Sequence, residues 1–193
     1  MLPRIDSKIR AGEAGERRIK EILMSHKACN HLYGKLFQNV YLGYGEHTKE
    51  LDFVSITSRG IFVVEVKYWS GQIQGALDDY EWIQHKTFET IYPRNPIKQN
   101  RKHTDKLKSV LGNTTKKFPF FPITVFVKNN APRIQSDELV NLVGLTSFLD
   151  RFGRDVDIPK KDVEIACASL DAYIKECGVT KAQHLRNIAK FRE

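Results

Sequence analysis

Cysteine is scarce and unpaired in this chain of 193 residues. The three cysteines, Cys29, Cys167 and Cys177, form no CxxC motif, which argues against a zinc ribbon and against a redox pair. The six histidines form no HxH or HxxxH motif, so neither a histidine-based zinc site nor a histidine-centred nucleophile is predicted. This cysteine usage favours a reducing compartment, and we expect a cytoplasmic protein.

Long hydrophobic runs are also absent. The longest apolar run is far shorter than the roughly 20 residues that cross a bilayer, and residues 1–20 contain no hydrophobic stretch typical of a signal peptide. We therefore expect neither a membrane anchor nor a secretory leader. The chain has no repeat or low-complexity tract, and its length fits a single domain of ordinary size.

Basic residues outnumber acidic ones. The chain has 31 Lys and Arg against 23 Asp and Glu, which gives a formal net charge of +8. Such an excess favours polyanionic partners, nucleic acid above all, because phosphates attract the basic side chains and counterions are released on binding. A solvated basic surface without a partner is the alternative interpretation.

Apolar periodicity predicts an alternation of helices and strands. The expected elements are a helix over 12–25, strands over 36–43, 50–56 and 61–68 with a turn at 57–60, short strands over 71–75 and 80–84, a helix starting near Pro96 and ending at Gly112, strands over 121–129 and from 139, a helix near Thr146, and two late helices over 160–176 and 179–192. This order predicts an α/β fold with a mixed central sheet flanked by helices.

Two charged residues interrupt the most apolar strand of the chain, "GIFVVEVKYW". Side chains two apart on a strand share a face, so Glu65 and Lys67 project together with Ile61 and Val63. The turn at 57–60 brings Asp52 opposite them. A half-exposed strand with a solvated face is the simpler interpretation, but charge is least expected in so apolar a strand.

Two carboxylates and an ammonium group in one small volume are suited to hydrolysis of a phosphate ester. Carboxylates are hard oxygen ligands for Mg²⁺, which takes one or two of them together with water and substrate phosphate oxygens. A bound metal polarises the phosphoryl group and activates water, and a nearby lysine orients or deprotonates that water or stabilises the charge of the transition state. These are the components of a metal-dependent phosphodiesterase.

The stretch "LDFVSITSRGIFVVEVKYWSGQI" (51–73) resembles the nuclease-related domain (NERD) family of the PD-(D/E)xK nuclease superfamily. The resemblance continues upstream in "GEAGERRIKEIL", and downstream in Trp82 and in "NPIKQN", so that it covers about residues 10–130. Leu51 stands where the name of the superfamily would place a proline, a departure of little weight.

The resemblance implies a restriction-endonuclease-like core, which we place over residues 1–135. The last part of the chain carries no motif of the family, and we expect residues 136–193 to form a C-terminal strand and helical extension packed on the same domain. The resemblance implies that Asp52 and Glu65 bind Mg²⁺ or Mn²⁺ and that Lys67 is the active-site lysine. It also implies that Glu16 on the first helix assists and that Gln99 lies at the site. The expected reaction is hydrolysis of phosphodiester bonds, with DNA as the expected substrate.

Several residues keep two interpretations. Glu13 and Glu16 share a helix face, and acidic residues near a helix N-terminus also simply complement the helix dipole. Tyr68, Trp69 and Trp82 are suited to stacking on bases, but aromatic residues more often fill a core.

The basic helix after Pro96 is similarly open. Lys98, Arg101 and Lys102, with Gln99, are candidates for nucleic-acid contact, although a charged helix face is often only solvated. A second function therefore stands beside the nuclease: a catalytically inactive nucleic-acid-binding or interaction module with the same fold. The sequence sets no oligomeric state.

Overall fold

The computed structural model describes residues 4–26, 33–43, 48–180 and 182–183. In chain order the elements are α1 (Arg4–Ser25), β1 (Lys35–Leu42), β2 (Lys49–Thr57), β3 (Gly60–Lys67), β4 (Gln72–Gln74), β5 (Ile83–His85), β6 (Thr90–Ile91), α2 (Pro96–Leu111), η2 (Gly112–Thr115), β7 (Phe120–Phe126), β8 (Leu139–Asn141), η3 (Leu142–Gly144), α3 (Leu145–Arg151) and α4 (Lys160–Cys177).

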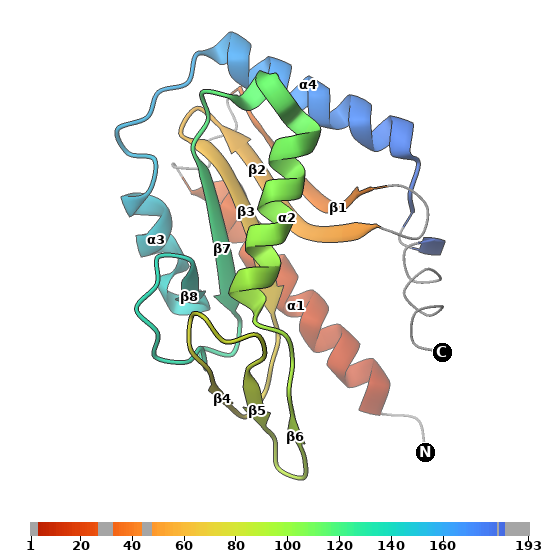
Figure 1. Cartoon of the computed structure of the whole chain (residues 1–193), viewed down its shortest axis with the longest axis vertical. Coiled ribbons are helices and arrows are strands. Elements are labelled where there is room, and N and C mark those ends of the chain that lie inside the picture. Colours follow the sequence, from red (N-terminus) through yellow and green to blue (C-terminus); the bar gives the residue numbers. More distant parts are fainter. Residues whose placement is uncertain (1–3, 27–32, 44–47, 181, 184–193) are drawn as a thin grey trace.

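The central sheet is mixed. Its five strands lie in the order β1-β2-β3-β7-β8, with antiparallel pairing from β1 to β3 and parallel pairing from β3 to β8 (Figure 1). The predicted turn between β2 and β3 is confirmed, and Gly60 closes it with a φ of +129°, which a side chain rarely permits. A mixed sheet flanked by helices confirms the predicted fold class, a restriction-endonuclease-like core.

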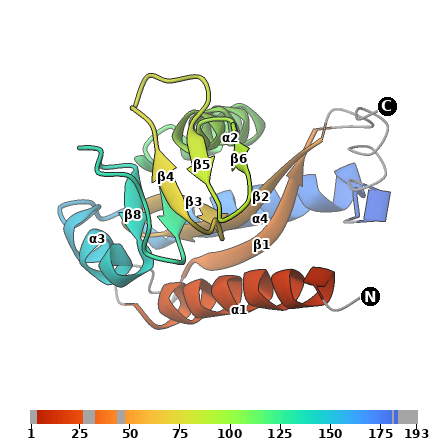
Figure 2. The ribbon, with the colours of Figure 1, turned by 90° about the horizontal axis from the view of Figure 1, so that it is seen from below.

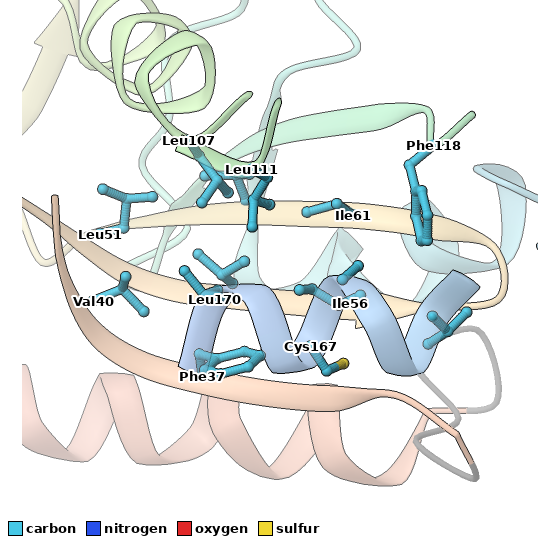
Figure 3. Close-up of a cluster of buried hydrophobic side chains, with 14 of the residues drawn as sticks. Phe37, Val40, Leu51, Ile56, Ile61, Leu107, Leu111, Phe118, Cys167 and Leu170 are labelled. Carbon is cyan, nitrogen blue, oxygen red and sulfur yellow. The ribbon is translucent and has the colours of Figure 1, made fainter. Parts of the chain in front are cut away.

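Helices cover both faces of this sheet, so the fold has three layers (Figure 2). The face that carries Ile61 and Val63 packs against α2 and α4 through Leu107, Leu111 and Leu170 (Figure 3). The opposite face packs against α1 and α3. The alternation predicted for β3 is confirmed, because its even-numbered apolar residues, Phe62, Val64 and Val66, all belong to the second cluster.

A small sheet of β4, β5 and β6 lies at the end of β3 that bears the charged residues (Figure 1). Trp82 fixes it to the core, since this side chain is fully buried, stacks on Phe126 at a centroid distance of 6.2 Å and donates from Nε1 to the Ala76 carbonyl. The core-packing interpretation of Trp82 is therefore correct.

Two asparagines hold α2 in place. Asn95 caps the helix by accepting from the Ile97 and Lys98 N–H groups. Buried Asn100 donates from Nδ2 to the Val63 and Ile123 carbonyls, at 3.0 and 3.1 Å, and so attaches α2 to both β3 and β7. The side chains at the start of α2 are consequently fixed relative to the end of β3.

The first helix is longer than predicted. It begins at Arg4 rather than at residue 12, and Gly12 therefore lies inside the helix. Gly15 does serve close packing, since a Cβ there would lie 2.9 Å from a methyl group of Val127. The short strand β6 was not predicted.

The later part of the chain extends the same sheet and covers it. β8 pairs with β7, and α4 buries Val163, Ala166 and Leu170 against the core. Thr180 accepts from the Gln183 N–H, as an N-cap does, but most of the helix predicted over 179–192 lies outside the described residues. Within the described ranges, no helix is both long and apolar enough to cross a membrane.

Candidate functional site

The two candidate metal-binding carboxylates meet where β2 and β3 diverge. The β2–β3 register ends with Phe53 opposite Val64, so the next positions place Asp52 against Glu65. Asp52 Oδ2 accepts from the Val66 N–H at 2.6 Å, which fixes the carboxylate against the end of β3. The hairpin thus brings together two residues that are separated by the whole turn, as the sequence predicts.

A local irregularity lies beside Asp52. Asn39 of β1 has a φ of +53°, and the β1–β2 register runs on either side of it without an Asn39–Asp52 pair. The alternation of β2 changes at the same point, so that Leu51 and Val54, three residues apart, contribute to one core cluster. The backbone of Asp52 therefore lies at a break in the β1–β2 ladder.

Glu65 is surrounded by donors. Its Oε1 accepts from Lys67 Nζ at 2.5 Å and from Gln99 Nε2 at 3.0 Å, while Lys67 also donates to Gln99 Oε1 at 3.2 Å. On the other side, His103 Nδ1 lies 3.3 Å from Glu65 Oε2. Glu65 is only 5% exposed, so these partners supply the positive charge and hydrogen bonds that a buried carboxylate needs.

The two carboxylates differ in their affinity for protons. Burial and the charge of Glu65 raise the pKa of Asp52 from 3.8 to about 8, despite the opposing effects of the Val66 N–H and Lys67. Burial acts in the same direction on Glu65, but the charge of Lys67 and the contact with His103 outweigh it and lower its pKa. Asp52 thus binds a proton more tightly than Glu65 does, and Glu65 is the more readily ionised member of the pair.

A pocket of about 570 Å³ opens over this pair. Asp52, Glu65 and Gln99 lie in its wall. Its lining also includes a ring of basic side chains: Lys49, Arg94, Lys98, Lys102 and His103. Carboxylates together with these basic side chains, which we call the basic rim, suit a metal ion together with a phosphate group, since each sign of charge has a partner of the opposite sign.

Three predicted residues are not part of the pocket wall, and one of them, Lys67, contacts Glu65 and Gln99 of that wall. Glu16 is half-buried on α1, and its charge makes a minor contribution to the raised pKa of Asp52. Arg101 Nε donates to Glu138 at 2.7 Å, and this hydrogen bond raises the pKa of Arg101. The role of Glu16 in catalysis and that of Arg101 in binding nucleic acid stay predictions.

Sequence reasoning missed seven residues of the pocket wall, among them His103, Tyr80 and Arg94. His103 follows Gln99 by four positions on α2, a helical spacing that places both on one face and could have signalled it. Tyr80 comes from the loop between β4 and β5, Arg94 follows β6, and an isolated bridge pairs Glu81 with Arg94. No short motif links these two residues to Asp52, because the fold alone brings them to the pocket.

The donor set fits magnesium or manganese better than zinc. Within the described part of the chain, no group of three or more His, Cys, Asp or Glu residues is arranged to hold a metal. Zinc sites use three or four protein ligands, whereas Mg²⁺ is satisfied by one or two carboxylates, water and substrate phosphate. Burial and the charge of Glu65 raise the pKa of Asp52, and a divalent ion held by both carboxylates would oppose both effects.

Comparison with known proteins identifies a family. The nuclease-related domain model matches residues 11–127, a span that contains Asp52, Glu65, Lys67 and Gln99. An uncharacterized protein of Bacillus anthracis is 34% identical over 94 residues, which are 48% of this chain and 42% of that protein. The match therefore spans less than half of the relative's length.

No solved structure matches the chain. The family match nevertheless covers more than half of the 193 residues and includes the strand pair, the small sheet and the start of α2. The chain belongs to the nuclease-related domain family.

Proposed function

We propose that the protein is a divalent-metal-dependent nuclease that hydrolyses phosphodiester bonds, with DNA as its substrate. The observation that carries the proposal is a pocket that Asp52, Glu65 and Gln99 line together with basic side chains, with Lys67 in contact with Glu65 and Gln99. Family membership supports a nuclease-related role. When bound by Asp52 and Glu65, Mg²⁺ or Mn²⁺ would polarise the phosphodiester and promote loss of a proton from water.

The protein's own residues would position the substrate and stabilise its charge. Lys67 is held between Glu65 and Gln99, and its ammonium group would balance negative charge that develops on the phosphate. Gln99 would fix both Lys67 and Glu65, since its amide donates to one and accepts from the other. Lys98 and Lys102, at the rim, would hold the phosphodiester backbone.

A cleavage assay tests the proposal. Purified protein is incubated with supercoiled plasmid, linear duplex and single-stranded DNA in Mg²⁺, in Mn²⁺ and in EDTA. We expect hydrolysis with either ion and none in EDTA, because the paired carboxylates require the ion to accept a phosphate group. Cleavage that persists unchanged in EDTA would contradict a metal-dependent mechanism.

Calorimetry separates the nuclease from an inactive binding module. A nuclease with this site binds Mn²⁺ through Asp52 and Glu65, and an Asp52→Asn variant loses that binding heat. Binding of DNA without any binding of Mn²⁺ would favour the inactive module, which has no need for two acidic groups that face a phosphate.

A further inference from the structure

Exposed aromatic side chains gather on the small sheet beside the pocket, and neither the core nor the proposed catalysis accounts for them. Seven large hydrophobic side chains are exposed in the described residues, and Tyr80, Phe88 and Tyr92 are three of them. Phe88 is 93% exposed, and the two tyrosines are each 63% exposed. The β5–β6 hairpin that carries Phe88 projects beyond the main body of the fold (Figure 1).

The tip of this hairpin is an ordered turn. The Lys86 N–H donates to the Glu89 carbonyl at 2.8 Å, and the two side chains form an ion pair at 2.7 Å. Behind the turn, His85 Nδ1 lies 3.1 Å from Thr90 Oγ1. Phe88 is thus held outward by a closed turn and is kept from folding back onto the sheet.

The small sheet is also fixed relative to the pocket. Trp82 is buried against Phe126, and a Cβ on Gly75 would lie 2.3 Å from its ring, so the loop beside it is packed without spare room. Asn95, which caps α2, donates to the carbonyls of Leu77 and Asp79 in the same loop. The aromatic residues and the catalytic candidates therefore share one rigid support.

One of the aromatic residues lies at the pocket, and the other two follow along the chain from Arg94 back to the tip of the β5–β6 hairpin. Tyr80 and Arg94 both line the pocket, and the Arg94 guanidinium lies 5.8 Å from the centre of the Tyr80 ring. Tyr92 follows the last residue of β6 and is separated from Arg94 by Pro93 alone. Phe88 lies beyond it at the turn. We call Tyr80, Tyr92 and Phe88 the aromatic track.

The chemistry of the aromatic track suits unpaired nucleotides. Every base has a planar face that stacks on an aromatic ring, and phosphates pair with basic side chains such as Arg94 and Lys98 at the start of the track. In a duplex the bases are already stacked on one another and do not offer their faces. A basic pocket that continues into exposed rings therefore matches a single strand better than a duplex.

We propose that the aromatic track binds the unpaired nucleotides of a strand whose phosphodiester enters the pocket, so that single-stranded nucleic acid or a single-stranded overhang is the preferred substrate. The preference for cleaving such strands depends on the proposed nuclease function. The binding of the strand depends only on the track and on the basic rim.

Fluorescence anisotropy tests the binding. A fluorescein-labelled single strand and its blunt duplex are titrated, in EDTA to prevent hydrolysis, with the full chain and with the double variant Phe88→Ala/Tyr92→Ala. We expect the double variant to bind the single strand at least about 10-fold more weakly, because each stacked base contributes substantially to affinity. Its affinity for the duplex should stay within about twofold of the parent.

Three comparisons make the test specific. Tyr33→Ala removes an aromatic side chain that is 43% exposed and precedes β1, and it should change neither affinity. Phe88→Trp/Tyr92→Phe keeps the rings and should restore single-strand binding, which excludes a folding defect as the cause. The loss in the alanine variant should be the same at low and high salt, whereas Lys98→Ala/Lys102→Ala should reduce the salt dependence itself.

The outcomes separate this inference from the proposed function. If the double variant loses single-strand affinity but the chain hydrolyses no phosphodiester, the track is supported and the nuclease is not. Unchanged single-strand affinity in an active nuclease would overturn the track. An equal loss of affinity for the single strand and for the duplex would also overturn it. If the double variant changed from dimer to monomer and bound both oligonucleotides as the parent does, the aromatic residues would form a protein interface, and the track would again be overturned.

Discussion

Replacing Lys67 with methionine should lower the rate of phosphodiester hydrolysis by about 10²–10⁴-fold, the usual effect of losing a positioned catalytic side chain. Lys67 is only 13% exposed and lies between Glu65 and Gln99, so no other described cation occupies its place against Glu65 Oε1. Nucleic-acid affinity should fall much less, because Lys49, Arg94, Lys98 and Lys102 remain at the rim. Initial rates with saturating Mg²⁺, beside anisotropy in EDTA, measure both quantities.

Two further variants show what a loss of activity in Lys67→Met means. Lys161→Met removes an exposed lysine on α4 and should leave the rate unchanged. Lys67→Arg keeps a positive charge but cannot lose a proton, so partial activity would indicate charge stabilisation, and inactivity equal to that of Lys67→Met would indicate proton transfer. Full activity in Lys67→Met would remove this residue from the mechanism.

Asp52→Asn should make the metal-free protein more stable at pH 8 while abolishing its response to divalent ions. The pKa of Asp52 is raised from 3.8 to about 8, so the folded state binds its proton more tightly than the unfolded state does. Stability from this group is complete below pH 4 and is lost as the pH rises towards 8. An asparagine keeps an oxygen for the Val66 N–H and has no proton to lose.

We therefore expect a gain of about 2–4 kcal/mol in the free energy of unfolding at pH 8, measured by urea denaturation in EDTA. At pH 4 the variant and the parent should be nearly equal. Addition of Mg²⁺ or Mn²⁺ should raise the melting temperature of the parent and leave that of the variant unchanged. A variant that is less stable than the parent at pH 8 would contradict a raised pKa for Asp52.

Glu65→Gln provides the matched contrast at the other carboxylate. The pKa of Glu65 is lowered by Lys67 and His103 in spite of burial, so its ionised form stabilises the fold above the pKa of the unfolded state, and this stability is lost as the pH falls. Removing its charge leaves Lys67 buried without its partner and should destabilise the protein by about 3–5 kcal/mol at neutral pH. Replacing each carboxylate with its amide is thus expected to change the free energy of unfolding in opposite directions: Asp52→Asn stabilises the protein at pH 8, and Glu65→Gln destabilises it.

The sequence predicts the centre of the site better than its boundary. The positions of Glu65 and Lys67 follow from the two-residue period of a strand, and that of Asp52 follows from one short turn. Both are local relations. The contact of Gln99 with Glu65 is a long-range one, which only the resemblance anticipated.

The remaining features depend on relations that a sequence does not display. Tyr80 and Arg94 reach the pocket because Trp82 and Asn95 fix a loop far from β2 along the chain. Arg101 lies in the basic helix between two predicted contacts, but Glu138, 37 residues later, pairs with it. The positive φ of Asn39 beside Asp52 likewise reflects strand pairing and not composition.

The proposed reaction depends most on a divalent ion held by Asp52 and Glu65. A crystal soaked in MnCl₂ and measured at the manganese absorption edge tests this directly. We predict one anomalous peak in the pocket within bonding distance of a carboxylate oxygen of each residue, and its absence in Asp52→Asn. Data of equal quality without a peak there, with Lys67 still bound to Glu65 in the soaked crystal, would contradict a metal-dependent site.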